Sequence, residues 1–193
     1  MSSFSQGESS LRVIETGFPG LLIAERRPFY DNRGSFHKLF SKAEITGCLA
    51  GRNIHQINIS HTTEKGTIRG MHFQFPPHSE CKAVHCIQGE AYDVAVDLRR
   101  CSSSFLKWHS EILCPENGKT FLIPPGFAHG FQALKKDTIL VYYHTEEYMP
   151  ANEGGLNPFD PLIGIEWPLE AGMMSERDTS HAMLTGSFKG LDV

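Results

Sequence analysis

The chain has 193 residues, of which 40% are hydrophobic and 21% charged, and its formal net charge is −4. This length suits one domain with a substantial core, and the weakly negative charge excludes the basic surface that nucleic-acid binding requires. No apolar run is long enough to span a membrane and the first residues do not resemble a signal peptide, so we expect a cytoplasmic protein that binds neither nucleic acid nor membranes.

The first part of the chain predicts short strands and little helix. Residues 1–10 are polar and rich in serine, which predicts a flexible N-terminal tail, and residues 11–193 are expected to form a single domain. Beyond the tail, short apolar segments alternate with turn residues, a pattern typical of β-strands. Only residues 41–50 suggest a short helix, with Ser41 as a possible N-cap and Glu44 three positions later.

The middle of the chain reads as consecutive strands. Many short strands separated by glycine and proline, with almost no helical periodicity, favour an all-β sandwich or barrel with minor short helices. Further along, residues 157–168 are expected to be irregular, and residues 173–178 to begin a short terminal helix. We predict strands over residues 82–87, 91–98, 120–123 and 138–145.

Two glycine-rich segments each carry a histidine. GTIRGMHFQ contains His72, and IPPGFAHGF contains His129. Because glycine lets the backbone approach a ligand closely, two such histidines on separate strands predict a pocket. Its chemistry would involve either a bound metal ion or proton transfer.

The metal alternative depends on the ligand spacing of metal-binding cupins. His129 fits the cupin pattern G-x5-P-x-G-x2-H-x3-N, except that Ala133 stands at the asparagine position. His72 opens the companion pattern, but Gln74 occupies the next ligand position and Glu80 follows at the wrong spacing. Divalent transition-metal ions prefer imidazole and carboxylate to a neutral amide, so we expect no bound metal.

The cysteines point to a reducing compartment. They are odd in number and irregularly spaced, and they contain no CxxC pair, so neither a disulfide framework nor a structural zinc site is expected. We predict free thiols at Cys48, Cys81, Cys86, Cys101 and Cys114.

Proton transfer that inverts a carbon centre needs a base and an acid on opposite faces of that carbon. Histidine suits the base near neutral pH, a carboxylate can orient it, and tyrosine is a sensible acid. The spacing of these residues alone does not pair them. In the strand over residues 138–145, Tyr142 shares a face with His144 and Tyr143 points the other way, which makes Tyr143 the better core residue.

Six segments resemble, in their order, the dTDP-4-dehydrorhamnose 3,5-epimerase family of RmlC-like cupins. They are IRGMHFQ, KAVHCIQGEAYDVAVDLRRCSSSFLKW, IPPGFAHGF, YYHTEEYMP, DPLIGIEWP and SERD, and the resemblance extends over residues 29–178. It implies a cupin-type jelly-roll domain that forms a homodimer and needs neither a metal nor an organic cofactor. The implied substrates are nucleotide-linked 4-keto-6-deoxyhexoses, epimerised at the carbons that flank the ketone.

The resemblance implies catalytic roles for four residues. His72 corresponds to the general base of the family, and Asp178 to the carboxylate that holds it. Tyr142 corresponds to the acid that returns a proton from the other face of the sugar. Lys82 is expected near the ketone or its enolate.

The resemblance also implies substrate contacts and shows one departure. Arg33 and Arg69 correspond to residues that contact the diphosphate, which suits the planar guanidinium. Lys38 stands where the family commonly has a glutamate, a change that could alter the preferred nucleotide or sugar. The full set of expected substrate contacts is Arg33, Gln56, Asn58, Arg69, His129, Glu153 and Arg177.

Three alternatives remain open. One is a mono-epimerase that acts at C3 or C5 of a dTDP-, CDP- or GDP-linked keto sugar, and Lys38 keeps this alternative open. The second is a metal-dependent cupin with an ion on His72 and His129. The third is a sugar-nucleotide binding module without catalytic activity.

Overall fold

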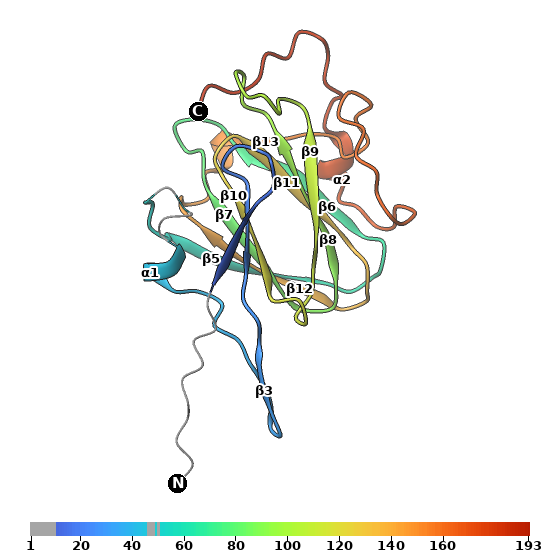
Figure 1. The fold of residues 1–193 in the computed structure, drawn as a ribbon. Helices are drawn as coiled ribbons and strands as arrows, with labels where there is room; N and C mark the ends of the chain where they lie inside the picture. The colour runs from blue at the N-terminus through green and yellow to red at the C-terminus, as the bar shows by residue number, and fades with distance from the viewer. Residues whose placement is uncertain (1–10, 46–48, 50) are drawn as a thin grey trace.

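Two antiparallel β-sheets packed face to face form the body of the computed structural model, which describes residues 11–45, 49 and 51–193 (Figure 1). One sheet has six strands in the order β1-β2-β10-β7-β12-β5, and the other has five in the order β13-β6-β11-β8-β9. The hairpin β3-β4 extends away from this body. The prediction of an all-β sandwich with minor short helices is confirmed. The tail predicted over residues 1–10 lies outside the described residues.

The elements agree closely with the patterns in the sequence. Each of the four predicted strands is present with its ends displaced by no more than one residue, and residues 157–168 are irregular as predicted. The strands are β1 (Arg12–Glu15), β2 (Leu22–Glu25), β3 (Phe29–Asp31), β4 (Gly34–Phe36), β5 (Gln56–Thr62), β6 (Ile68–Gln74), β7 (Lys82–Gln88), β8 (Ala91–Asp97), β9 (Trp108–Leu113), β10 (Lys119–Ile123), β11 (Phe127–Ala133), β12 (Thr138–His144) and β13 (Glu153–Gly155).

Helical structure is limited to short elements. They are α1 (Lys42–Ile45), the 3₁₀ turn η1 (Pro150–Asn152) and α2 (Glu176–Ser180). Helix α1 lies within the predicted residues 41–50, of which 46–48 and 50 are outside the described part of the chain. Helix α2 begins within the predicted residues 173–178. No helix of the described residues is long and apolar enough to cross a membrane.

The core between the sheets comes from alternate residues of the facing strands. Phe121 and Leu140 belong to the six-stranded sheet and pack with Phe131 of the other sheet. A second cluster forms where the C-terminal segment covers the outer face of the five-stranded sheet, with Val94 and Val96 contributed by β8. Strand β8 is therefore buried on both faces. The four cysteines of the described residues are free thiols, as predicted, and Cys48 lies outside those residues.

A bulge in β6 changes which of its side chains share a face. His129 of β11 pairs with His72 of β6. Two residues further along β11, Phe131 pairs with Arg69, which lies three residues from His72. Regular alternation would place Arg69 and His72 on opposite faces, whereas the bulge lets both line one cavity. Gly70 lies in the bulge with a φ of +121°, where a Cβ would come within 2.6 Å of the β11 backbone.

Candidate active site

A cavity of about 980 Å³ gathers the residues that the sequence singled out. Strands β5, β6, β7, β11, β12 and β13, helix α2 and the segment leading into it contribute to its walls. Ten of the eleven predicted site residues line it, and Arg33 does not. The ten are Gln56, Asn58, Arg69, His72, Lys82, His129, Tyr142, Glu153, Arg177 and Asp178.

The first functional group in the cavity is a histidine–carboxylate pair. Nε2 of His72 lies 2.7 Å from Oδ1 of Asp178, and the Asp178 side chain is only 3% exposed. The sequence SERD forms the start of α2, where the Ser175 hydroxyl caps the helix by accepting a hydrogen bond from the Asp178 backbone N–H at 3.1 Å. This cap holds Asp178 in the first turn, from which its carboxylate also accepts a hydrogen bond from the Gly70 N–H at 3.1 Å.

These contacts keep the Asp178 carboxyl ionised. Burial would raise its pKa, but the hydrogen bonds from His72 and from the Gly70 backbone outweigh burial and lower the pKa to about 2. A carboxylate of this kind stabilises an imidazolium and orients the ring, as a proton-accepting histidine requires.

The same pKa predicts how stability changes in acid. Because the folded-state pKa of Asp178 is below its ordinary value of 3.8, the carboxylate stabilises the fold above about pH 4. That contribution, about 2 kcal/mol, is lost as the pH falls from 4 towards 2. We expect the difference in unfolding free energy between wild type and Asp178→Asn to shrink by this amount between pH 5 and pH 2. Urea denaturation at several pH values measures it, and a difference independent of pH would contradict the assignment.

Arg177 makes a second contact with the His72 ring. Its Nη2 lies 2.8 Å from Nε2 of His72, and its Nη1 donates to the Glu153 carboxylate at 2.9 Å. In neutral His72, the Nε2 nitrogen carries either a proton or a lone pair, and not both. With a proton, Nε2 donates to Asp178 and leaves Nδ1 as the basic nitrogen; with a lone pair, Nε2 accepts from Arg177. Asp178 and Arg177 therefore favour opposite tautomers of His72, and the ionised Asp178 requires the proton on Nε2.

Tyr142 supplies a hydroxyl to another wall of the cavity. Its Oη lies 2.9 Å from the Ser60 Oγ, and its ring makes an edge contact with His129 at 6.1 Å between centroids. Burial raises the pKa of Tyr142 above its usual range, so the phenol stays protonated at neutral pH and can act as a proton donor. Tyr143 points the other way, as alternation predicted, and packs in a core cluster against the ring of Phe40.

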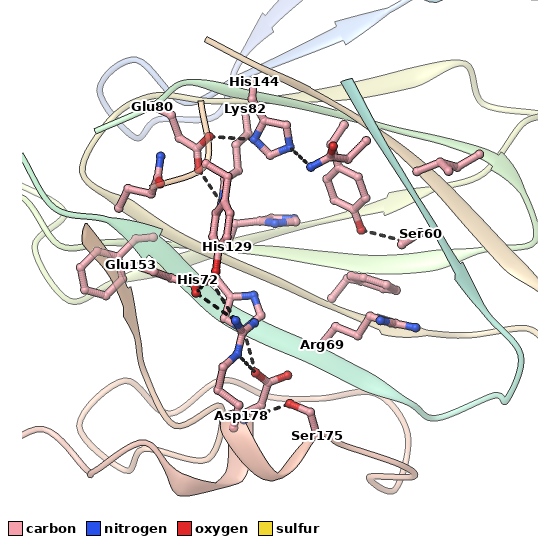
Figure 2. A pocket seen from close by; sticks show the side chains of 18 of the residues that line it. Ser60, Arg69, His72, Glu80, Lys82, His129, His144, Glu153, Ser175 and Asp178 are labelled. Carbon is pink, nitrogen blue, oxygen red and sulfur yellow. Dashed lines mark hydrogen bonds and ion pairs between the residues drawn. The ribbon is translucent and has the colours of Figure 1, made fainter. Parts of the chain in front are cut away.

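Lys82 belongs to a buried group of three charged or polar side chains. Glu80 contacts Lys82 Nζ at 3.1 Å through one carboxylate oxygen and His144 Nδ1 at 2.7 Å through the other. Burial would raise the pKa of Glu80, but Lys82 and His144 lower it overall, so the carboxylate stays charged. Figure 2 shows this group and the His72–Asp178 pair on opposite sides of His129.

The Lys82–Glu80 pair predicts a stability effect that a double variant can test. In Glu80→Ala, Lys82 loses its carboxylate partner although the lysine side chain is only 12% exposed. We expect this change to lower the free energy of unfolding by about 3 kcal/mol. Glu80→Leu combined with Lys82→Met removes both charges and should recover most of that loss. Urea denaturation measures both variants. A loss below about 0.5 kcal/mol in Glu80→Ala would show that Lys82 finds another partner.

His129 lies between these groups and has a carboxylate of its own. Its Nε2 is 2.9 Å from Oδ1 of Asp93, which is completely buried inside the sandwich. Burial raises the pKa of Asp93, and the interaction with His129 only partly offsets this effect. The pair holds the His129 ring in place at the cavity wall.

The remaining predicted contacts of the cavity are held by hydrogen bonds. Gln56 donates to Asn58 at 2.8 Å, and both lie on β5. Arg69 is held from β5 as well, through the Thr62 hydroxyl at 3.0 Å. Glu153 accepts from the Tyr148 hydroxyl at 2.8 Å and pairs with Arg177. These side chains give the cavity a lining with many polar atoms, which suits a polar ligand.

Two residues highlighted by the resemblance lie away from the cavity. Arg33 stands on the β3-β4 hairpin, where its guanidinium contacts Asp31 at 2.5 Å and its side chain is 74% exposed. Lys38 follows that hairpin and lies 3.4 Å from Glu44. Within a single chain, neither residue contacts a molecule bound beside His72.

Sequence reasoning did not assign a role to several cavity residues. Ser60 is on the same face as Asn58 by alternation along β5, so the pattern QINIS could have indicated it. Glu80 was considered only as a metal ligand, and His144 only as a neighbour of Tyr142 on one strand face. Nothing in the local pattern joins Glu80 to His144, since the two are 64 residues apart.

The cupin ligand positions are engaged by other groups. The amide of Gln74 donates to the His78 and Glu147 carbonyls and accepts from the Met149 N–H, so it holds two loops together. Glu80 is bonded to Lys82, as described above. The donor set that remains at these positions is a poor match to divalent transition-metal ions.

Comparison with known proteins identifies the family of this chain. A sequence profile of the dTDP-4-dehydrorhamnose 3,5-epimerase family matches residues 15–186. The dTDP-4-dehydrorhamnose 3,5-epimerase of Sinorhizobium fredii is 40% identical over 176 residues, which cover 88% of this chain and 90% of that protein.

Solved structures extend the similarity to the whole fold. The dTDP-6-deoxy-D-glucose-3,5-epimerase of Legionella pneumophila, in complex with dTDP-4-keto-L-rhamnose, is 35% identical with a TM-score of 0.85, over 90% of this chain and 93% of that one. ChmJ, a 3'-monoepimerase from Streptomyces bikiniensis in complex with dTDP-quinovose, is 29% identical with a TM-score of 0.80, over 86% and 85% of the two chains. The predicted cupin-type jelly roll is confirmed. This chain therefore belongs to the dTDP-4-dehydrorhamnose 3,5-epimerase family.

Proposed function

We propose that this protein inverts both C3 and C5 of a dTDP-linked 4-keto-6-deoxyhexose, with His72 as base and Tyr142 as acid. Family membership makes the chain an isomerase of the sugar-nucleotide epimerase class. The observation that carries the finer proposal is the placement of the His72–Asp178 pair and the Tyr142 hydroxyl on different walls of one cavity, with His129 and Lys82 also facing it.

The chemistry starts from the acidity that a ketone gives to its neighbouring carbons. The C4 ketone lets C3 or C5 lose a proton as an enolate, and neutral His72 takes that proton while Asp178 stabilises the resulting imidazolium. Lys82 donates a hydrogen bond to the developing oxyanion, and His129 joins it as an imidazolium, because its Nε2 proton is already engaged by Asp93. Tyr142 then protonates the carbon from the opposite face, which inverts it, and the histidine and tyrosine exchange protons with solvent before the next round.

Arg177 and the substrate diphosphate are proposed to prepare the base. The guanidinium lies against Nε2 of His72. A diphosphate offers this half-exposed arginine several anionic oxygens. When Arg177 moves to the diphosphate, Nε2 is left to donate to Asp178, and Nδ1 becomes the basic nitrogen.

A second candidate is a mono-epimerase that inverts only C3. The similarity to the 3'-monoepimerase ChmJ favours it, because that protein shares the fold over 86% of this chain. A base and an acid facing the sugar serve one inversion as well as two. The difference between the candidates lies in whether the sugar can reposition so that C5 also reaches His72.

We also propose that two copies of the chain form a homodimer. The β3-β4 hairpin carries large apolar side chains that are more than half exposed, and so does β5, an edge strand of the six-stranded sheet. A second copy would cover these groups and the free edge. They are Phe29, Tyr30, Phe36, Ile57 and Ile59.

The dimer would also account for Arg33. Because Arg33 stands on the extended hairpin outside the cavity of its own chain, a diphosphate contact requires that the hairpin reach the cavity of the second copy. Sedimentation velocity at micromolar concentrations should show a dimer, and Phe36→Glu should shift it to monomer. A monomeric wild-type protein would contradict the proposal. The four free thiols of the described residues fit our proposal of a cytoplasmic location.

Incubation with nucleotide-linked sugars in deuterated water tests the function. We expect dTDP-4-keto-6-deoxyglucose to gain deuterium and to invert at both C3 and C5, as followed by NMR. Label at C3 alone would establish the mono-epimerase. The CDP- and GDP-linked sugars are compared in parallel to test nucleotide preference. We expect the activity to survive treatment with a chelator. If no substrate gained deuterium, the proposal would be refuted.

A further inference from the structure

A third side chain with a free ligand nitrogen lies beside the His72–Asp178 pair. In the described part of the chain, His72, Asp178 and His181 each offer one ligand atom, and these atoms lie within 4.8 Å of one another. This group differs from the cupin-type pair predicted from the sequence patterns, which joined His72 to His129. It contains two imidazoles and one carboxylate, the donor types that zinc and related ions prefer.

The local structure holds His181 against the pair. His181 is the C-cap residue of the short helix α2 and follows Asp178 by three positions, and the two side chains lie close together. The buried amide of Asn157 donates to the His181 carbonyl at 3.2 Å and to the Thr179 carbonyl at 3.4 Å, so the backbone is held at this point.

A glycine makes room for the imidazole of His181. Gly155 on β13 pairs with His72 on β6, and a Cβ at Gly155 would lie 2.0 Å from Nε2 of His181. The ring therefore packs directly on the strand pair that carries His72. Any larger residue at position 155 would displace the ring from the His72–Asp178 pair.

The packing of His181 against Gly155 leaves one ring nitrogen of the histidine without a hydrogen-bond partner. Nε2 of His181 is buried and has no hydrogen-bond partner among the described residues. A buried polar atom of this kind carries an energetic cost unless a water or an ion satisfies it. The His181 ring lies beside the Asp178 carboxylate, so its surroundings suit a cation.

We propose that His72, Asp178 and His181 form a binding site for a divalent transition-metal ion of the zinc type. Zinc bound by three protein side chains keeps a fourth position for water or another ligand. Its bonds of about 2.0–2.2 Å hold the donor atoms about 3.5 Å apart, so small side-chain rotations suffice to close the group. This site goes beyond the proposed epimerase reaction, in which no metal takes part.

Arg177 is the natural competitor of the ion. Its guanidinium now lies 2.8 Å from Nε2 of His72 and 3.6 Å from Asp178, so it occupies the cationic position of this group. Its side chain is 51% exposed and is also held by Glu153, so it can withdraw towards solvent. The ion and Arg177 therefore exclude one another. Bound zinc would engage His72 and would inhibit proton abstraction.

Zinc binding by the purified protein tests this proposal without any assay of activity. Metal-free protein is titrated with zinc chloride in an isothermal calorimeter, and magnesium chloride serves as the oxygen-preferring control ion. We expect one zinc site per chain that depends on His181, weakened about 100-fold in His181→Asn, since loss of even an indirect supporting residue costs 10–100-fold. Arg177→Gln should bind zinc at least about 5-fold more tightly, because a competing cation is gone.

A matched control is available in another histidine–carboxylate pair. Nε2 of His61 lies 3.0 Å from Asp137, and His61 is absent from the three-residue group and from the cavity wall. His61→Asn should leave zinc binding unchanged. Equal affinities in wild type and His181→Asn would overturn the proposal, as would an Arg177→Gln variant no tighter than wild type. If the proposed epimerase activity is present, zinc should inhibit it and chelator should restore it; if it is absent, the calorimetry still decides the metal site.

Discussion

His72→Asn is expected to lose exchange of the sugar hydrogens with deuterated water by about 10³-fold, because general-base catalysis of this kind contributes 10²–10⁴-fold. Asparagine is close to histidine in size and can still donate to Asp178, so the cavity keeps its shape while the basic nitrogen is lost. Both exchange and inversion should fall together, since the enolate forms before either carbon can be inverted. NMR of substrate and product in deuterated water measures the two rates.

The control for this variant is His61→Asn. His61 also pairs with a carboxylate, that of Asp137, but its side chain is half exposed and lies outside the cavity. It should retain the wild-type exchange rate. Full exchange in His72→Asn would remove His72 as the base and would leave His129 as the next histidine to test, because it pairs with His72 across β6 and β11.

Tyr142→Phe should separate the two halves of the reaction. Without the phenol, His72 can still remove a proton and return one to the same face, so exchange should persist at a reduced rate. Inversion should fall by about 10²–10³-fold, because protonation from the opposite face loses its donor. The change removes one hydrogen bond, to Ser60, so the variant is expected to stay folded within about 1 kcal/mol of wild type.

Tyr143→Phe is the matched control for the tyrosine. Tyr143 is adjacent in sequence, but it packs in a core cluster behind the strand and does not line the cavity. The phenylalanine keeps the ring that stacks on Phe40 at 5.6 Å, so both stability and activity should be retained. If Tyr143→Phe were the damaging variant, the assignment of strand faces in β12 would be wrong by one residue.

Much of the fold could be predicted because its signals are local. Alternation and glycine–proline turns are properties of neighbouring residues, and they located four strands to within one residue at each end. The same alternation separates Tyr142 from Tyr143, because successive side chains of a strand point to opposite faces. The position of α2 could be predicted as well, since a serine followed by acidic residues is a local helix-start signal.

The candidate site could be predicted only in part. The resemblance singled out ten residues that do line one cavity, but among them it paired only His72 with Asp178. Arg33 shows the limit most clearly, because its motif position predicted a substrate contact while the residue lies outside the cavity of its own chain. Glu80 shows another limit. Its partner His144 is 64 residues away, and no periodic pattern relates them.

By itself, the sequence determined the all-β class, the order of the strands along the chain and the face on which each side chain lies where the strand is regular. Tertiary structure decided the rest. The bulge in β6 placed Arg69 beside His72 against regular alternation, and the docking of α2 brought Asp178 to His72 across 106 residues. The docking of α2 also brought His181 close to His72 and Asp178. The physical reason is that these contacts depend on strand register and segment docking, which arise from packing between distant parts of the chain.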